Sequence, residues 1–316
     1  MKFLFISPRF DGGIGGHASM LADQLTSVGH DVTKLITPHI PIKNLKNPSF
    51  AVFGTIKGIL NHEKYDIVHG FNVPSTFAMH YSKGKKKVLS IHGVFSDQVQ
   101  KLHSKAISSI ASKTESKVLK WADALTTDSR FTQKLYKEKL GFDFEYLPSA
   151  IDTKKLDEIP NVTKNERQII YLGRDSYEKG IDIVKKIEPE LDGKVVYCTN
   201  LPWKEAMLEL KKSSVLLVPS RLESLPTNIK EAFYLKIPTV GTNVGGIPEL
   251  IHNKKTGLLA SANDQNKIIE LTNLLLSDKK LSNELVEQAY DFVTNNMSWK
   301  SVIPSYINFY KNLLNS

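Results

Sequence analysis

The sequence predicts an α/β protein made of two doubly wound domains, each with a parallel sheet covered by helices. Short, unbroken apolar runs alternate with amphipathic stretches along the whole chain, which is typical of buried parallel strands joined by helices. The alternation starts twice, and both times its first apolar run leads into a loop that contains glycine. The 316 residues are enough for two sizeable hydrophobic cores.

The first half contains six apolar runs that we expect to be strands. They are residues 3–6, 32–36, 67–68, 88–91, 124–126 and 144–147. Between them, residues 17–28 and 131–140 have the apolar spacing of amphipathic helices. We therefore expect one sheet within residues 1–150, the N-terminal domain.

The second half restarts the pattern with a strand at 168–173, followed by runs at 195–197, 215–218 and 239–241. We expect these runs to form the second sheet, in a domain of residues 151–298. The polar stretch 152–166, which contains Pro160, is the expected linker. Residues 299–314 have a helical pattern that includes Ile303, Ile307 and Tyr310, and we expect residues 299–316 to return to the first domain.

The composition is that of an ordinary globular protein, with 41% hydrophobic and 24% charged residues, and excludes disordered and collagen-like chains. Cys198 is the single cysteine, so an intrachain disulfide is impossible, as suits a reducing compartment. The initial apolar run is too short for a signal peptide, and no segment approaches the ~20 apolar residues of a membrane span. These features predict a cytoplasmic protein.

The net charge of +9 lies mostly in the first half of the chain. Residues 1–160 hold 22 lysines and arginines against 15 acidic residues, and residues 161–316 hold 20 against 18. Such an excess suits nucleic acid, acidic membrane lipid or a phosphorylated substrate, and equally a merely soluble surface. No nucleic-acid-binding motif accompanies it.

A glycine-rich loop follows the first predicted strand and precedes a helix. Gly12, Gly13, Gly15 and Gly16 allow backbone amides to approach an anion at the helix N-terminus. Positions 13, 15 and 18 also satisfy Gly-x-Gly-x-x-Ala, but no acidic residue ends the second strand, as a dinucleotide site requires. The loop is therefore either a phosphate-approach loop or a tight turn without a ligand.

The second half has further candidates at its strand ends. Arg174 and Lys179 bracket the loop 173–180 and could clamp a diphosphate, although such residues are often merely solvated. Glu223 and Glu231 could accept hydrogen bonds from sugar hydroxyls, and the amides of residues 224–227 could bind phosphate. Glu231 also has a simpler explanation, because a negative charge stabilises a helix N-terminus. No metal-binding motif is present.

Several short motifs follow one another in a characteristic order. They are Gly-Gly-Ile-x-x-His (12–17), Asp-Ile-Val-His (66–69), Gly-Arg with Lys-Gly (173–180), Pro-Ser with Glu-x7-Glu (219–231), Gly-Gly-x-x-Glu (245–249) and Gly-Leu-Leu (257–259). In this order and spacing the sequence resembles the retaining, family-4-type glycosyltransferases (glycosyl transferases group 1) with the GT-B fold, over nearly the whole chain. The resemblance implies two Rossmann-like domains facing across a cleft.

The resemblance also implies a function. A retaining hexosyltransferase of this type moves a sugar from a UDP- or GDP-sugar to an acceptor hydroxyl of a glycan, glycolipid or lipid-linked acceptor. It needs no metal and no cofactor beyond this donor. Arg174 and Lys179 would hold the leaving diphosphate, Glu223 would bind the donor sugar and Glu231 the nucleotide ribose.

The remaining site residues follow from the same resemblance. The amides of Ser224, Leu225, Pro226 and Thr227 would lie beside the donor. Gly13 and Gly15 would touch the diphosphate from the first domain. His92, at a strand end, falls where the family has a histidine near the transferred sugar; a packing role is equally open.

The chain departs from the family pattern in two places. Ser149-Ala150 stands where the family usually has Asn-Gly before a hydrophobic residue and Asp152. The segment between Gly180 and Pro219 has one strand pattern where relatives usually have two. The second domain is therefore expected to be trimmed, with the base bound near residues 198–201, including Thr199.

Two other functions remain open from the sequence. One is a different enzyme on the same fold, such as a sugar-nucleotide epimerase or a phosphorylase, and the other is a non-catalytic sugar-nucleotide-binding protein. Residues 98–121, a lysine-rich helix pattern, and the lysines within 83–87 suggest peripheral contact with anionic membrane, at the inner membrane face. A solvated helix packed on the sheet explains the same pattern.

Overall fold

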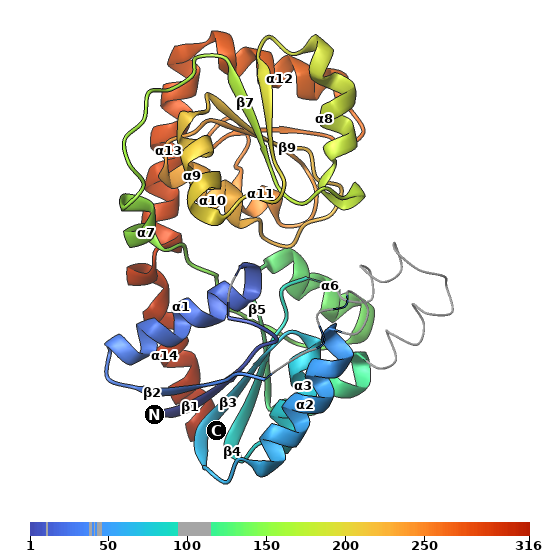
Figure 1. Ribbon diagram of the computed structural model, residues 1–316, viewed down its shortest axis with the longest axis vertical. Coiled ribbons are helices and arrows are strands. Elements are labelled where there is room, and N and C mark those ends of the chain that lie inside the picture. Colours follow the sequence, from blue (N-terminus) through green and yellow to red (C-terminus); the bar gives the residue numbers. More distant parts are fainter. Residues whose placement is uncertain (11, 38–39, 41, 43–45, 94–114) are drawn as a thin grey trace. The chain divides into compact units, whose positions relative to one another are not determined.

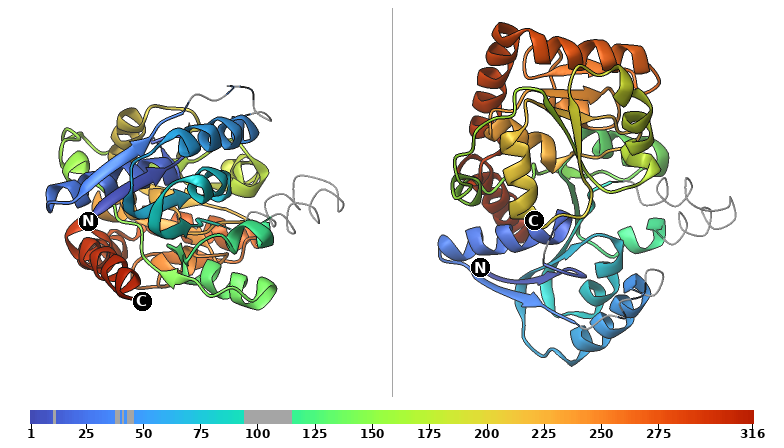
Figure 2. Two further views of the ribbon diagram at one scale, coloured as in Figure 1. Left: turned by 90° about the horizontal axis from the view of Figure 1, so that it is seen from below. Right: turned by 45° about the horizontal axis from the view of Figure 1, so that its top comes forward.

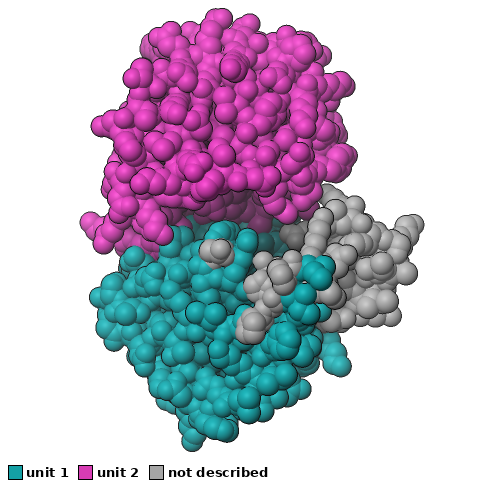
Figure 3. Space-filling view, viewed as in Figure 1, with its two compact units in different colours: residues 1–149, 302–316 teal, residues 150–301 magenta. Residues whose placement is uncertain are grey.

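The computed structural model describes residues 1–10, 12–37, 40, 42, 46–93 and 115–316, which form two compact units (Figures 1 and 3). Unit 1 contains residues 1–149 and 302–316, and unit 2 contains residues 150–301. Each unit has one parallel sheet with helices packed on it. This arrangement confirms the predicted two-domain α/β fold.

Unit 1 is built on a six-stranded sheet with the order β2-β1-β3-β4-β5-β6, parallel throughout. Its strands are β1 (Lys2–Ile6), β2 (Asp31–Leu35), β3 (Tyr65–Phe71), β4 (Gly84–Ser90), β5 (Ala124–Thr127) and β6 (Glu145–Tyr146). Its helices include α1 (Gly13–Ser27), α2 (Lys46–Leu60), α3 (Thr76–Tyr81), α6 (Arg130–Leu140) and most of α14 (Trp299–Asn315). The two ends of the chain thus lie in the same unit (Figure 2).

Strand β1 is buried on both faces of this sheet, which explains its unbroken apolar sequence. Leu4 and Ile6 belong to the core that includes Phe50 of α2 and Met79 of α3. On the opposite face, the ring of Phe3 lies 4.9 Å from that of Tyr310 in α14. The period of two along the strand therefore divides its side chains between two helical layers.

A buried histidine in β3 is tied to α14 by its ring. His69 Nδ1 forms a hydrogen bond of 2.7 Å with the Tyr310 hydroxyl, and Nε2 forms one of 2.6 Å with Ser90 Oγ. Burial, together with the neighbouring His17 and His92 imidazoles, holds the pKa of His69 well below its usual value of 6.5. His69 is therefore neutral in the folded protein at neutral pH.

This low pKa predicts a loss of stability in mild acid. Below about pH 6.5 the unfolded chain binds a proton at this histidine and the folded chain does not, so the free energy of unfolding falls as the pH falls. The expected slope from this group is about 1.4 kcal/mol per pH unit. Urea unfolding from about pH 7.5 to about pH 5 should show this slope reduced in His69→Gln; equal slopes in both proteins would contradict the assignment.

Unit 2 is built on a five-stranded sheet with the order β11-β10-β9-β7-β8, again parallel. Its strands are β7 (Gln168–Leu172), β8 (Lys194–Cys198), β9 (Val215–Val218), β10 (Thr239–Thr242) and β11 (Leu258–Ala260). Its helices are α7 (Thr153–Asp157), α8 (Ile181–Ile187), α9 (Trp203–Lys212), α10 (Thr227–Tyr234), α11 (Ile247–Leu250), α12 (Gln265–Ser277) and α13 (Lys279–Met297). Strand β11 and helices α12 and α13 lie beyond the last strand that the sequence pattern predicted.

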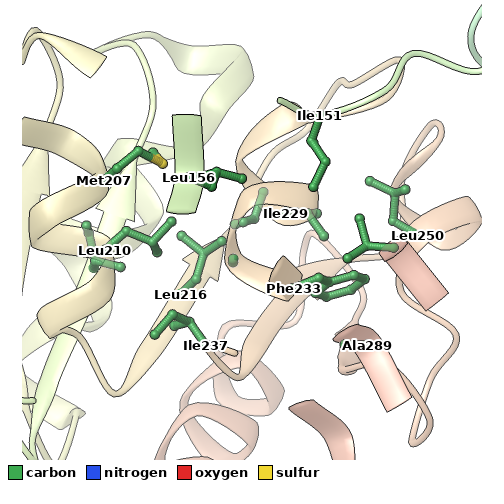
Figure 4. Close-up of a cluster of buried hydrophobic side chains, with 14 of the residues drawn as sticks. Ile151, Leu156, Met207, Leu210, Leu216, Ile229, Phe233, Ile237, Leu250 and Ala289 are labelled. Atoms are coloured by element: carbon green, nitrogen blue, oxygen red, sulfur yellow. The ribbon is translucent and has the colours of Figure 1, made fainter. Parts of the chain in front are cut away.

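The side chains of β7 divide between two cores in the same way. Ile170 belongs to the cluster formed with α7, α9, α10 and α13, part of which is drawn in Figure 4. Ile169 and Tyr171 belong to the cluster formed with α8 and α12. Both faces of this sheet are therefore covered by helices.

The predicted linker is wrong. Residues 152–166 include the helix α7, whose N-cap Asp152 accepts a hydrogen bond from the amide of Lys155. Leu156 and Ile159 are 1% and 3% exposed and belong to the core of unit 2 (Figure 4 labels Leu156). The stretch reads as polar because only these few side chains face the core of so short a helix.

Lys179 ends a 3₁₀ turn (Tyr177–Lys179), and α8 begins at Ile181 after Gly180. Of the expected helix over residues 98–121, residues 98–114 lie outside the described residues. Within the described ranges, no helix combines the length and the apolar character that crossing a bilayer requires.

Candidate active site

Three loops of unit 2 meet at the carboxyl ends of β7, β9 and β10. The amides of Arg221 and Leu222, after β9, donate to the carbonyl of Glu178, after β7, at 2.8 and 3.3 Å. The hydroxyl of Thr242, at the end of β10, donates to the carbonyl of Ser220 at 2.5 Å. In doubly wound sheets, ligands bind at this edge. The loops therefore form one connected surface where the sequence places most of the donor-binding residues.

Glu223 is held at both its carboxylate and its backbone. Lys179 Nζ forms an ion pair with Glu223 Oε1, and Ser220 Oγ donates to the same oxygen at 3.2 Å. The amide of Gly246 donates to the Glu223 carbonyl at 3.4 Å. The Glu223 side chain is 10% exposed and that of Lys179 is 23% exposed. An ammonium group has three N–H donors, so Lys179 can bind an anion while it keeps Glu223.

Two glycines permit this close packing of the loops. Gly180 has a φ of +72°, and a Cβ atom there would lie 2.0 Å from the carbonyl oxygen of Pro219. Gly245 has a φ of +56°, and its Cβ would lie 1.9 Å from the carbonyl oxygen of Glu223. Both positions exclude a side chain by backbone conformation and by space. Their glycines are therefore needed for the geometry around Lys179 and Glu223.

Arg174 is more exposed than Lys179. Its side chain is 72% exposed, and its guanidinium lies 3.2 Å from the carboxylate of Glu178. A second arginine nearby, Arg221, is bound on both sides: it forms a bidentate pair with Asp182 at 2.7 Å and stacks on the Tyr177 ring at 4.0 Å. Arg221 thus stabilises the loop, whereas Arg174 is placed to bind an anion at the surface.

Helix α10 begins directly after this loop, with Pro226 as its N-cap. Among the described residues no side-chain cap is seen on the helix, and the amides of the first turn of a helix have no partner within the helix itself. Leu225 and Pro226 are buried, Ser224 is half-buried, and Thr227 is exposed. Ser224 and Leu225 lie in the loop before α10, and Thr227 is the first residue of the helix. Each of these three residues has a backbone N–H, which Pro226 lacks, and their role in binding phosphate remains a prediction.

Glu231, one turn into α10, is half-buried, and its carboxylate accepts a hydrogen bond of 2.7 Å from the Trp203 indole. Burial raises the pKa of Glu231, against the opposing effects of Trp203 and of the neighbouring Lys230. Trp203 begins α9, a few residues after Thr199 at the end of β8. The hydrogen bond from Trp203 thus brings the start of α9, which follows the loop after β8, to Glu231.

A separate cluster surrounds His92 in unit 1. His92 Nδ1 lies 3.0 Å from Asp128 Oδ2, and Ser149 Oγ donates to the same oxygen at 2.8 Å. Because a carboxylate only accepts, Nδ1 of His92 carries a hydrogen and donates it to Asp128. The ring of His17 lies 5.3 Å from that of His92, and His17 Nε2 bonds the Tyr306 hydroxyl at 3.0 Å.

The two glycines of unit 1 that were predicted to contact the donor have different surroundings. Gly15 is buried in α1, and a Cβ there would lie 2.3 Å from the carbonyl oxygen of Arg9, so a tight turn alone requires this glycine. Gly13 is exposed with a φ of +45°, and a Cβ there would meet nothing within 4 Å. Of these two glycines, only Gly13 therefore leaves space beside its backbone for a ligand. That Gly13, Gly15 and His92 meet the donor remains a prediction.

The structure brings together Lys179, Glu223 and the start of α10, and it places Ser220, from the Pro-Ser motif, beside Glu223. It adds two partners that the sequence did not single out, Trp203 at Glu231 and Asp128 at His92. Asp128 follows a buried strand directly, and this position was the signal that could have identified it. Trp203 had no such signal, because its contact joins two helices far apart in the sequence.

The site can bind an anion and a polyhydroxylated group side by side. Lys179, Arg174 and the α10 amides suit phosphate oxygens, and the carboxylates of Glu223 and Glu231 suit hydroxyl groups. In the described part of the chain, no three His, Cys, Asp or Glu side chains gather in a way that could hold a metal ion.

This fold and site define the class of GT-B glycosyltransferases, and the comparisons with known proteins agree. The family model of glycosyl transferases group 1 matches residues 186–292, and that of glycosyltransferase family 4 matches residues 11–155. The chain therefore belongs to the glycosyltransferases of the group 1 and family 4 type.

Two distant relatives match most of the length of the chain. An uncharacterized protein of the cps region of Klebsiella pneumoniae is 26% identical, over 83% of each chain. An uncharacterized glycosyltransferase of Methanocaldococcus jannaschii is 22% identical, over 96% of this chain and 95% of that protein.

Solved structures share the fold. Sucrose-phosphate synthase of Thermosynechococcus elongatus has a TM-score of 0.81 at 15% identity, with 99% of each chain covered. The Anabaena protein HepE, in complex with UDP-glucose, has a TM-score of 0.72 at 12% identity, covering 99% of this chain and all of that one.

Proposed function

We propose that this glycosyltransferase is a retaining enzyme that takes its sugar from a nucleotide-diphosphate sugar and transfers it to an acceptor hydroxyl without a metal ion. The observation that carries the proposal is the Lys179–Glu223 pair, held by Ser220 beside the N-terminus of α10. This arrangement places a cation and backbone amides, which can bind phosphate, next to a carboxylate, which can accept hydrogen bonds from sugar hydroxyls. The UDP-glucose complex of HepE supports this class of donor.

The chemical task is to break the bond between the anomeric carbon and the diphosphate. Negative charge grows on the leaving phosphate oxygen, and preorganised cations and amides stabilise it most where water is excluded. Lys179 and the α10 amides supply such groups on unit 2, and Arg174 adds a second cation. Glu223 would fix the sugar through a hydroxyl, and Glu231 would bind the ribose. The loop at Thr199 would lie beside the base.

In the proposed reaction, the acceptor oxygen attacks the anomeric carbon on the face from which the diphosphate leaves. The new carbon–oxygen bond forms as the old one breaks, and the acceptor proton passes to the departing phosphate oxygen. No protein base is needed for this step. We propose that unit 1 binds the acceptor, with Nε2 of His92, whose ring Asp128 fixes, as a hydrogen-bonding group there.

A donor panel tests this function. The enzyme is incubated with UDP-glucose, UDP-N-acetylglucosamine and GDP-mannose, and two readouts are taken: the thermal midpoint and the release of nucleoside diphosphate. We expect one donor to raise the midpoint and to be hydrolysed slowly without an acceptor, at a rate that EDTA does not change. Binding without any release would contradict catalysis, and a product of inverted anomeric configuration would contradict retention.

A further inference from the structure

Trp203 is an exposed aromatic residue that donates a hydrogen bond to Glu231. Its indole Nε1 lies 2.7 Å from Glu231 Oε1, and the residue is 39% exposed. Leu201, two residues earlier in the loop before α9, is 44% exposed. Among the described residues of unit 2, only Tyr177 is a further large apolar side chain of comparable exposure. The loop therefore places an uncommon apolar surface beside a carboxylate.

The contact of Trp203 with Glu231 is not needed to hold α9 against α10. Met207 of α9 belongs to the same buried cluster as Ile229 and Phe233 of α10, and Figure 4 labels all three. A hydrogen bond near the surface replaces one with water and adds little to such packing. Packing of the two helices thus does not explain why an exposed tryptophan is placed at this carboxylate.

The hydrogen bond fixes Glu231 through one of its two carboxylate oxygens. Among the described residues, none donates a hydrogen bond to the other oxygen, Oε2. An indole N–H donates without carrying a charge, so it orients the carboxylate and leaves its negative charge in place. Burial raises the pKa of Glu231, and the hydrogen bond from Trp203 opposes this increase and favours the ionised form. Oε2 is thus a preoriented acceptor for a hydroxyl group.

A nucleoside matches this combination of groups. Its ribose offers hydroxyl donors, and hydrogen bonds from a hydroxyl to an ionised carboxylate are stronger than those to a neutral acceptor. Its base has flat apolar faces, which favour contact with aromatic and apolar side chains. The surface formed by Leu201 and Trp203, next to Glu231, can therefore contact a nucleoside on its apolar and its polar parts.

We propose that Trp203 is a positioning residue through which the enzyme selects ribonucleotide donors over deoxyribonucleotide donors. The inference rests on the proposed function, in which Glu231 binds the ribose of the donor. Trp203 holds the Glu231 carboxylate so that Oε2 accepts from a ribose hydroxyl, and a donor without that hydroxyl leaves a half-buried carboxylate unpaired. A site built to bind a hydroxyl rejects the analogue that lacks it more strongly than an apolar pocket can.

Affinities for nucleoside diphosphates test the inference without any sugar transfer. Of UDP, GDP and ADP, the one that raises the thermal midpoint most is compared with its 2′-deoxy and 3′-deoxy forms by isothermal titration calorimetry. We expect at least one deoxy form to bind the wild type about tenfold more weakly. In Trp203→Phe, which keeps an aromatic ring but has no N–H, this ratio should fall to about threefold or less.

A second substitution shows whether Trp203 acts through Glu231. Glu231→Leu removes the acceptor, and leucine is a good helix former, so α10 should stay folded. This variant should lose the preference for the ribonucleotide, and adding Trp203→Phe should then change its affinity by less than about twofold, because the two residues act as one unit. If Trp203→Phe weakened the ribo and deoxy forms equally, Trp203 would act by packing alone, and the inference would be overturned.

Tyr234 provides a matched control on the same helix. Its hydroxyl donates to Asp157 Oδ1 at 2.7 Å, the length of the Trp203 hydrogen bond. Tyr234→Phe should therefore keep the affinity and the preference of the wild type. Equal binding of the ribo and deoxy forms by the wild type would overturn the inference and leave the proposed function standing. Failure of all three diphosphates to bind would contradict both.

Discussion

Replacing Lys179 by methionine is expected to lower the turnover of the donor sugar about a thousandfold in a protein that still folds. Methionine retains much of the volume of the lysine stem but carries no charge. The loss follows from the role of the ammonium group, since removing one preorganised group that stabilises developing negative charge typically costs about 10²–10³ in kcat. The affinity for a nucleoside diphosphate should fall as well, whereas that for the nucleoside alone should not.

The same substitution should also destabilise unit 2. Glu223 is 10% exposed and would keep a buried charge, with the Ser220 hydroxyl still donating a hydrogen bond to its carboxylate. We expect the free energy of unfolding to fall by about 1–2 kcal/mol, below the cost of breaking a fully buried pair. The double variant Lys179→Met/Glu223→Gln should regain most of this stability, because no charge is then left unpaired, and it should stay inactive.

A lysine elsewhere in unit 2 serves as the control. Lys236 pairs with Glu287 at 2.7 Å, but both side chains are about half exposed. Lys236→Met should therefore change the free energy of unfolding by about 0.5 kcal/mol or less and leave turnover unchanged. Turnover of Lys179→Met at the wild-type rate would show that this lysine serves the fold alone, and that the diphosphate is held elsewhere.

The fold was predictable from the sequence because buried parallel strands leave a strong local signal. The runs around Phe5, Ile170 and Leu216 are apolar on both faces, and each is short and flanked by loops. The segment at Leu156 was mistaken for a linker because its few buried side chains produce no recognisable apolar periodicity in the sequence. Strand β11 was missed because three residues carry too little pattern, although Gly257-Leu258-Leu259 had been noted as a motif.

The site was predictable in its residues but not in its pairing. Lys179 and Glu223 were singled out separately, and only the structure shows that they form one ion pair. Asp128 could not be assigned to His92 from the sequence, since the contact depends on two neighbouring strands, β4 and β5, ending at the same edge of the sheet. Such partners are set by topology, which local residue patterns do not encode.

The second large effect is expected at the two glycines that allow the loops of unit 2 to meet. Gly180→Ala and Gly245→Ala should each lower the free energy of unfolding by about 3 kcal/mol or more. A left-handed backbone costs alanine roughly 1–2 kcal/mol, and the overlap with a backbone carbonyl adds to this cost. A Cβ at 1.9–2.0 Å from an oxygen must be relieved by about 1 Å of backbone movement, since real Cβ contacts are essentially never shorter than 3.0 Å.

Activity should fall for the same reason, even where the variants are folded. Gly245 lies against the Glu223 carbonyl, so relief of the overlap displaces the residue that we assign to the donor sugar. A misplacement of about 1 Å in a catalytic site costs about a hundredfold in rate. We expect kcat to fall by this factor for Gly245→Ala, measured well below its thermal midpoint.

Gly141 serves as a control that separates the free-energy cost of a left-handed backbone from the cost of steric overlap. It ends α6 with a φ of +69°, close to the +72° of Gly180, and a Cβ there would meet nothing within 4 Å. Gly141→Ala should therefore lose only about 1–2 kcal/mol and keep full activity. If all three alanine variants lost the same stability, the carbonyl contacts at Pro219 and Glu223 would contribute nothing, and the tight meeting of these loops could not be what holds Glu223 in place.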